Sequence, residues 1–122
     1  MRKLGRYSEH RMSMLKNLCA SLIEHGKIIT TLYRAKELKN SVEPLITRAK
    51  VKNLHNRRML LAYLNNNEQI VNKLFEIGEL SINRNGGYTR VLRFGFRSDG
   101  GTKAFIQIID YPSGATDDQG NK

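Results

Sequence analysis

The sequence predicts an α+β fold, a two-layer α/β sandwich in which helices cover a small sheet. Apolar residues recur at three- and four-residue steps over most of the first eighty positions, then alternate with polar residues from about position 88. A chain of 122 residues, of which 39% are hydrophobic, is most simply one domain with a modest core. We expect the order helix, strand, three helices, two strands, with a three-stranded mixed sheet.

The first helix is predicted over about residues 9–25. Ser8 is a plausible N-cap, and Gly26 is a natural stop. Its apolar stripe consists of Met12, Leu15, Leu18, Cys19, Leu22 and Ile23. Residues 1–7 are basic and lack periodicity, which is typical of an extended arm. The β-branched segment 27–31 suits a strand.

Two further helices follow this strand. A threonine at 30 or 31 can cap the second helix, whose apolar period continues to about residue 51. Pro44 lies inside that span and lacks a backbone N–H, so we expect the helix to bend or restart there. Asn53 can cap the third helix, which is predicted to continue through Leu64.

A short fourth helix and a hairpin complete the domain. Asn67 can cap the helix, which is expected to end before Gly78. Residues 88–97 and 103–111 read as antiparallel strands joined by a glycine-rich turn. The apolar side of the first of these strands carries Leu92, Phe94 and Phe96. We expect the helices to cover the apolar face of the sheet.

The chain is therefore predicted to comprise an N-terminal arm (1–7), one α/β domain (8–111) and a disordered tail (112–122). The tail is rich in Gly, Ser, Asp and Asn. A lone cysteine, Cys19, excludes an internal disulfide and suits a small core position. No apolar run approaches the length of a membrane span, and no signal peptide is recognisable.

The positive charge is concentrated in the first half of the chain. Residues 1–58 contain fourteen Lys and Arg against four Glu, whereas residues 59–122 contain seven of each sign. The whole net charge of +10 therefore belongs to the first half, where it is self-repulsive without a polyanion. This favours nucleic acid as the partner over a merely solvated basic surface or an anionic membrane.

The candidate binding residues fall into clusters along the chain. The arm carries Arg2, Lys3 and Arg6, the first helix carries Arg11 and Lys16, and the second helix carries Lys36. The joint between the second and third helices carries Lys50, Lys52, His55, Arg57 and Arg58, and the loop and hairpin add Arg84, Tyr88 and Arg90. Arginine suits phosphate oxygens, and Tyr or His can stack on an unpaired base. Because no major-groove reading motif is present, this dispersed pattern favours RNA over DNA.

Catalytic and metal-binding patterns are scarce. The chain lacks phosphate-binding glycine loops, a nucleophile elbow and a zinc-protease motif. Its three histidines, His10, His25 and His55, are widely spaced and do not form a ligand cluster. We therefore expect no enzymatic activity, no cofactor, no metal and no small-molecule substrate.

Several fragments stand together in one order that is familiar. They include Lys3-Leu4-Gly5-Arg6, Met14-Leu15-Lys16-Asn17-Leu18, Arg34-Ala35-Lys36-Glu37-Leu38 and Gly86-Gly87-Tyr88-Thr89-Arg90. Over about residues 2–111 the sequence resembles the bacterial large-subunit ribosomal protein family numbered seventeen. The resemblance implies a cytoplasmic ribosome constituent that binds large-subunit rRNA, touches neighbouring ribosomal proteins and supports subunit assembly and translation.

The resemblance also implies which residues face RNA. In that family the N-terminal arm and first helix lie against rRNA, which carries over to Arg2, Lys3, Arg6, His10, Arg11, Lys16 and Asn17. The elements around His55–Arg58 and Gly86–Arg90 are matched as well. The alternative is a free-standing RNA-binding chaperone that works outside the ribosome. A small nuclease and a membrane-binding protein are weaker alternatives.

Overall fold

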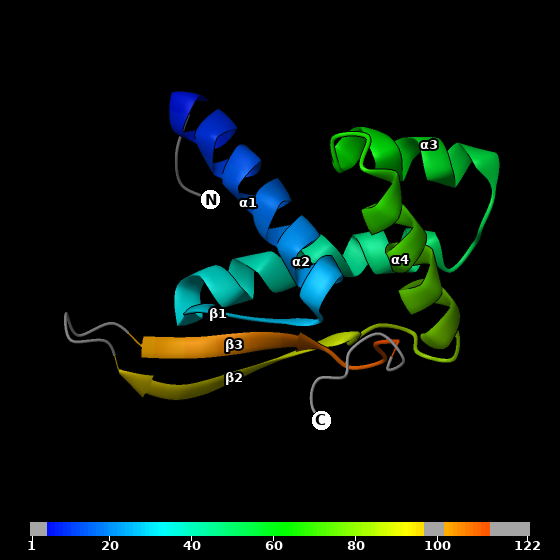
Figure 1. The fold of residues 1–122 in the computed structure, drawn as a ribbon. Helices are drawn as coiled ribbons and strands as arrows, with labels where there is room; N and C mark the ends of the chain where they lie inside the picture. The colour runs from blue at the N-terminus through cyan, green and yellow to red at the C-terminus, as the bar shows by residue number, and fades with distance from the viewer. Residues whose placement is uncertain (1–4, 97–101, 113–122) are drawn as a thin grey trace.

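The computed structural model describes residues 5–96 and 102–112, with side chains over 9–95 and 102–112. The elements are α1 (Gly5–His25), β1 (Lys27–Thr31), α2 (Leu32–Ala49), α3 (Leu54–Tyr63), α4 (Glu68–Leu80), β2 (Thr89–Phe96) and β3 (Thr102–Ile108). The predicted order of elements and the α+β class are confirmed. Figure 1 shows the two layers, with the helices on one side of the sheet. None of the described helices is long and apolar enough to cross a membrane.

The sheet is antiparallel throughout, so the predicted mixed sheet is wrong. The strand order is β1-β3-β2, and both pairings with β3 are antiparallel. β1 and β2 run in the same direction, but β3 lies between them and no parallel pair forms. One cross-strand row joins Ile29, Phe105 and Leu92. This row lies on the face of the sheet away from the helices.

The first helix begins earlier than the sequence suggested. It starts at Gly5, so Ser8 is a helical residue and not the N-cap. The predicted apolar stripe is fully buried only at Cys19, Leu22 and Ile23, whereas Met12 is 55% exposed. The first turns of α1 stand clear of the sheet, as Figure 1 shows. Met12 finds no core there, and so its side chain stays in solvent.

The second helix is continuous. Thr31 caps it by accepting a hydrogen bond from the backbone N–H of Arg34 at 3.3 Å, as predicted. The helix passes through Pro44 to Ala49 without restarting. The cap predicted at Asn53 for α3 is confirmed, with its side chain accepting from the backbone N–H of Asn56 at 2.8 Å.

The fourth helix continues through Gly78 to Leu80, so the predicted end before Gly78 is wrong. Its predicted cap, Asn67, is confirmed. A Cβ atom at position 78 would lie 2.5 Å from the carbonyl oxygen of Ala49. The glycine therefore serves close packing of α4 against α2 and does not terminate the helix.

The core lies between the helices and the inner face of the sheet. Its largest fully buried side chains include Leu22, Leu38, Ile46, Leu74, Ile77 and Ile106. Cys19 is also fully buried, as expected, and burial raises the pKa of its thiol to about 12. Leu92 and Phe94, expected beneath the helices, are 43% and 51% exposed. On β2, Val91 packs against the core beneath the helices instead.

Candidate nucleic-acid interface

The projecting part of α1 carries the first group of predicted RNA-facing residues. His10 and Asn17 are exposed. Lys16 lies with its ammonium 5.1 Å from the centroid of the Tyr63 ring, which connects α1 to α3. The backbone of Arg6 belongs to α1, whereas Arg2 and Lys3 lie outside the described residues. This end of the helix presents polar and basic side chains on a segment that contributes little to the core.

Arg11 has a role inside the protein. Its guanidinium forms an ion pair with Glu37 and donates a hydrogen bond to the Tyr33 hydroxyl at 3.2 Å. Both charged side chains of the pair are about one-fifth exposed. Arg11 therefore braces α1 against α2, and its charge is largely neutralised by Glu37.

The joint between α2 and α3 carries the second group. Lys52, His55 and Arg58 are exposed there. Arg57 instead donates to the side-chain oxygen of Asn72 on α4 at 2.9 Å and lies 3.7 Å from Glu68. The joint thus presents two cations and an imidazole to solvent, while its remaining arginine ties α3 to α4.

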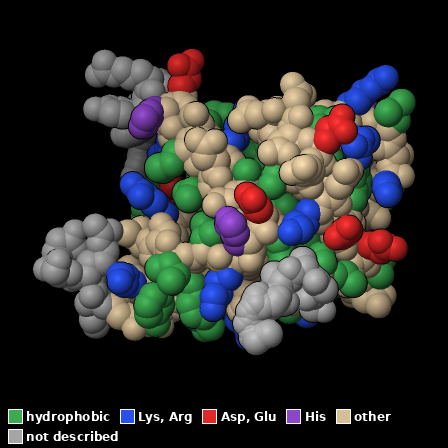
Figure 2. All heavy atoms as spheres, in the orientation of Figure 1, with side chains coloured by type: hydrophobic (Ala, Val, Ile, Leu, Met, Phe, Trp, Pro, Cys, Tyr) green, Lys and Arg blue, Asp and Glu red, His purple; other side chains and the backbone are tan. Residues whose placement is uncertain are grey.

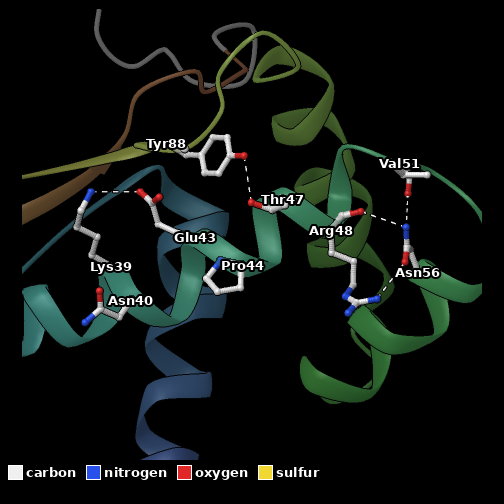
Figure 3. Close-up of a pocket in the computed structure, with 10 residues that line it drawn as sticks. Lys39, Asn40, Glu43, Pro44, Thr47, Arg48, Val51, Asn56 and Tyr88 are labelled. Carbon is white, nitrogen blue, oxygen red and sulfur yellow. Dashed lines mark hydrogen bonds and ion pairs between the residues drawn. The ribbon is translucent and has the colours of Figure 1, made fainter.

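A buried amide holds this joint in shape. Asn56 is only 9% exposed, and its side-chain amide donates to the carbonyls of Arg48 and Val51 at 3.2 and 2.7 Å. Its side-chain oxygen accepts from the Arg48 guanidinium at 3.1 Å. Figure 3 shows Asn56 between these partners at the end of α2. The amide pairs the Val51 carbonyl and adds a second bond to the Arg48 carbonyl, which also accepts from the backbone N–H of Val51, and so it sets the direction in which α3 leaves α2.

Lys50, Arg84 and Tyr88 also make internal contacts. Tyr88 is 1% exposed, and its hydroxyl accepts from Thr47 at 3.0 Å and from Lys50 at 3.1 Å. These hydrogen bonds, chiefly the one from Thr47, hold the pKa of Tyr88 below its usual value despite burial. Lys50 also donates to the backbone carbonyl of Arg84, and Arg84 pairs with Asp110 at 2.6 Å. A base cannot stack on the Tyr88 ring in this arrangement.

Glu43 anchors the loop that precedes β2. Its carboxylate accepts from the backbone N–H of Gly87 at 3.1 Å and of Thr89 at 3.0 Å, and from the Lys39 ammonium at 3.2 Å. Burial raises the pKa of Glu43, but the hydrogen bonds from Thr89 and Lys39 together outweigh it, and the pKa lies below its ordinary value. Figure 3 shows Glu43 and Lys39 beside an open hollow of about 640 Å³.

Exposed acidic side chains lie on α1, at Glu9 and Glu24, and on α4. The exposed acidic residues of α4 are Glu68, Glu76 and Glu79. In Figure 2, red side chains are visible at the upper left, near the centre and on the right, and blue side chains lie among them. Lys36 on α2 and Arg90 on β2 are both exposed. The basic surface therefore consists of separate groups on α1, α2, the α2–α3 joint and the sheet.

Sequence reasoning missed a further group of cations on the outer face of the sheet. Lys27 and Lys103 are exposed there, on β1 and β3. Arg34, at the start of α2, lines a hollow together with Lys103. Strand alternation would have placed Lys27 and Ile29 on one face, but only the pairing of β1 with β3 shows that Lys103 and Phe105 share it.

Comparison with known proteins identifies the family. The sequence profile described as ribosomal protein L17 matches residues 14–109. The chain belongs to the ribosomal protein L17 family. It is 51% identical over 110 residues to the large ribosomal subunit protein bL17 of Moorella thermoacetica. The matched segment covers 88% of this chain and 97% of that relative.

Membership of the L17 family confirms the resemblance expected from the sequence. It makes the chain a ribosomal protein, a structural constituent and not an enzyme. The L17 profile begins at residue 14, inside α1, and ends just past β3. It thus spans the buried half of α1 and every other described element.

Proposed function

We propose that this chain is a constituent of the large ribosomal subunit and binds large-subunit rRNA through α1 and the α2–α3 joint. The residues assigned to the RNA are Arg2, Lys3, Arg6, His10, Lys16, Asn17, Lys36, Lys52, His55, Arg58 and Arg90. Arg11, Lys50, Arg57, Arg84 and Tyr88 act chiefly inside the protein, where they hold the surface in shape. Neighbouring large-subunit proteins are its further partners.

The observation that carries this proposal is the projecting start of α1. A helix normally stays folded because one face packs on a core. Here the first turns carry Arg6 and His10, and none of their described side chains, residues 9–12, belongs to the core. A polyanion beside this end would neutralise the charge and cover the exposed Met12. The family assignment makes rRNA the natural polyanion.

The mechanism is charge neutralisation with a fit of shape. Each phosphate paired with a lysine or arginine releases condensed counterions, so affinity falls as salt rises. The ion pair of Arg11 with Glu37 and the amide of Asn56 fix the angles between helices before RNA arrives. The protein therefore presents its cations at set positions and loses little conformational freedom on binding.

Salt dependence tests the joint directly. Lys52→Gln combined with Arg58→Gln removes two exposed charges, and each lost phosphate contact should lower the slope of log affinity against log salt by about 0.7–0.9. Lys73→Gln on α4 is the matched control. It removes one positive charge, half of the loss in the double variant, from a side chain that donates to the backbone carbonyl of Glu24. An unchanged slope in the double variant, measured with an rRNA fragment, would exclude the joint from the interface.

Sedimentation separates the ribosomal role from the chaperone alternative. We expect the tagged full chain to travel with large subunits in a gradient at moderate salt. Recovery mainly in the light fractions, with RNA binding intact, would favour the free-standing RNA-binding chaperone.

A further inference from the structure

The outer face of the sheet is an uncovered apolar surface. All described helices lie on the other face. The row Ile29–Phe105–Leu92 crosses the three strands, and Phe94 packs beside Phe105 with ring centroids 5.9 Å apart. Ile29 is 62% exposed and Phe94 is 51% exposed. Adjoining exposed apolar groups of this kind usually mark a binding surface.

Phe94 lies on the same face as Leu92, two residues earlier on β2, and a β-bulge interrupts the pairing there. Arg93 pairs with Ala104, whereas the next paired residue is Gly95, opposite Lys103. Phe94 is thus an extra residue between two pairs, and its ring lies beside the outward-facing Phe105. The bulge puts Gly95, which has no side chain, opposite Lys103. The exposed ring of Phe94 and the partly buried ring of Phe105 therefore lie next to each other on the outer face.

Cations lie in the cross-strand rows on both sides of the apolar row. Lys27 and Arg90 lie opposite Gln107 in the row on one side, and Lys103 lies opposite Thr31 and Gly95 on the other. Beside Ile29, a hollow of about 290 Å³ is lined by Thr30, Thr31, Arg34 and Lys103. None of the outward-facing residues described on the three strands is acidic. Figure 2 shows the apolar side chains at the lower left, over β2 and β3, with basic side chains on either side.

Aromatic side chains next to cations indicate which kind of partner binds this face. Exposed aromatic rings on a sheet bind unpaired bases by stacking, and surrounding cations bind the connecting phosphates. The Lys27 ammonium already lies 4.6 Å from the centroid of the Phe105 ring, so cation and aromatic surface are adjacent. A protein partner would need its own carboxylates to match these cations, whereas RNA supplies a phosphate with every nucleotide.

We propose that the outer face of the sheet is a second RNA site, which binds unpaired nucleotides by stacking on Phe94 and Phe105. Lys27, Arg90, Lys103 and Arg34 hold the phosphates. The proposal extends the function proposed above, because it adds a single-stranded contact on the opposite layer from α1 and the α2–α3 joint. One chain would thereby hold two separate parts of a folded RNA.

Binding of a short, labelled, unstructured oligouridylate to the full chain tests the site. Removing an aromatic stacking contact weakens single-strand binding by roughly 5- to 100-fold, which is the loss expected for Phe94→Ala. Phe94→Leu keeps the apolar contact but lacks a ring, so most of the same loss is expected. Leu80→Ala is the control, because Leu80 is 53% exposed on α4, away from the sheet. Wild-type affinity in Phe94→Leu, or an equal loss in Leu80→Ala, overturns the proposal.

Photocrosslinking identifies the occupant in the assembled particle. A full chain carrying Phe94→p-benzoylphenylalanine, incorporated into large subunits, should crosslink to an unpaired rRNA nucleotide. A crosslink to another protein, to a second copy or to the chain itself overturns the stacking site. These results are independent of the salt-slope test at the joint. If rRNA binding depends on Lys52 and Arg58 but not on Phe94, only the sheet site fails.

Discussion

Replacing Gly78 by alanine is expected to destabilise the domain, although alanine is the better helix former. Gly78 lies inside α4, where it meets the backbone of Ala49 at the end of α2. An added Cβ would lie 2.5 Å from the carbonyl oxygen and 2.6 Å from the carbonyl carbon of Ala49. Both atoms belong to backbone, so no flexible side chain can move aside.

The magnitude follows from two opposing effects. Ordinary contact begins near 3.4 Å, so one helix must shift by about 0.9 Å relative to the other. Overpacking of this kind costs about 3 kcal/mol where backbone must move, and alanine regains about 1 kcal/mol in helix propensity. The net loss is about 2 kcal/mol in the free energy of unfolding, or about 9 °C in Tm for about a hundred ordered residues.

Thermal unfolding followed by circular dichroism measures this difference. Gly95→Ala is the matched control, because no heavy atom lies within 4 Å of the Cβ position there. It should change stability by no more than about 0.5 kcal/mol. A Gly78→Ala variant with the wild-type Tm or a higher one would refute the close-packing argument.

Three other substitutions probe the contacts that shape the surface. Asn56→Ala removes the amide that pairs the Val51 carbonyl, whereas the Arg48 carbonyl keeps its bond from the backbone N–H of Val51. It should lower the free energy of unfolding by about 1–2 kcal/mol in a urea titration; wild-type stability would contradict this. Tyr111→Phe removes the hydroxyl whose single proton lies within reach of the carbonyls of Ile23 and Glu24 at the end of α1, at 2.7 and 2.6 Å. A loss of about 1 kcal/mol is expected by the same assay, and an unchanged stability would show that water replaces the hydroxyl. Glu43→Gln should cost about 1–2 kcal/mol at pH 7. Because folding lowers the pKa of Glu43 from 4.5, this contribution is present above pH 4.5 and disappears as the pH falls through the folded-state pKa; a cost that grows toward acid pH would contradict the assignment.

Local patterns were sufficient for most of the elements. The caps at Thr31, Asn53 and Asn67 act within three residues of themselves, so the sequence shows them directly. The hairpin of β2 and β3 follows from alternation around a turn. The predicted start of α1 and the predicted end of α4 were wrong. Ser8 and Gly78 mark a helix boundary only when the helix does not continue through them for other reasons, such as the close packing of Gly78 on Ala49.

For the candidate RNA-binding surface too, the sequence predicted some features and the tertiary contacts decided others. Counting charges predicted a nucleic-acid partner, and the order of motifs predicted the family that the comparisons confirm. Counting does not distinguish a cation in solvent from one engaged inside the fold. Lys50 and Arg84 differ from Lys52 and Arg58 only in what packs around them.

The amino-acid sequence alone therefore determined the class of fold, the excess of positive charge and the kind of partner. Each of these depends on residues that are close together along the chain or on the sum of the charges. Tertiary structure alone decided that β3 lies in the middle of an antiparallel sheet, that Tyr88 is buried and that Phe94 is exposed. These features depend on pairings between segments distant along the chain, where many registers satisfy the same local pattern and only packing selects one.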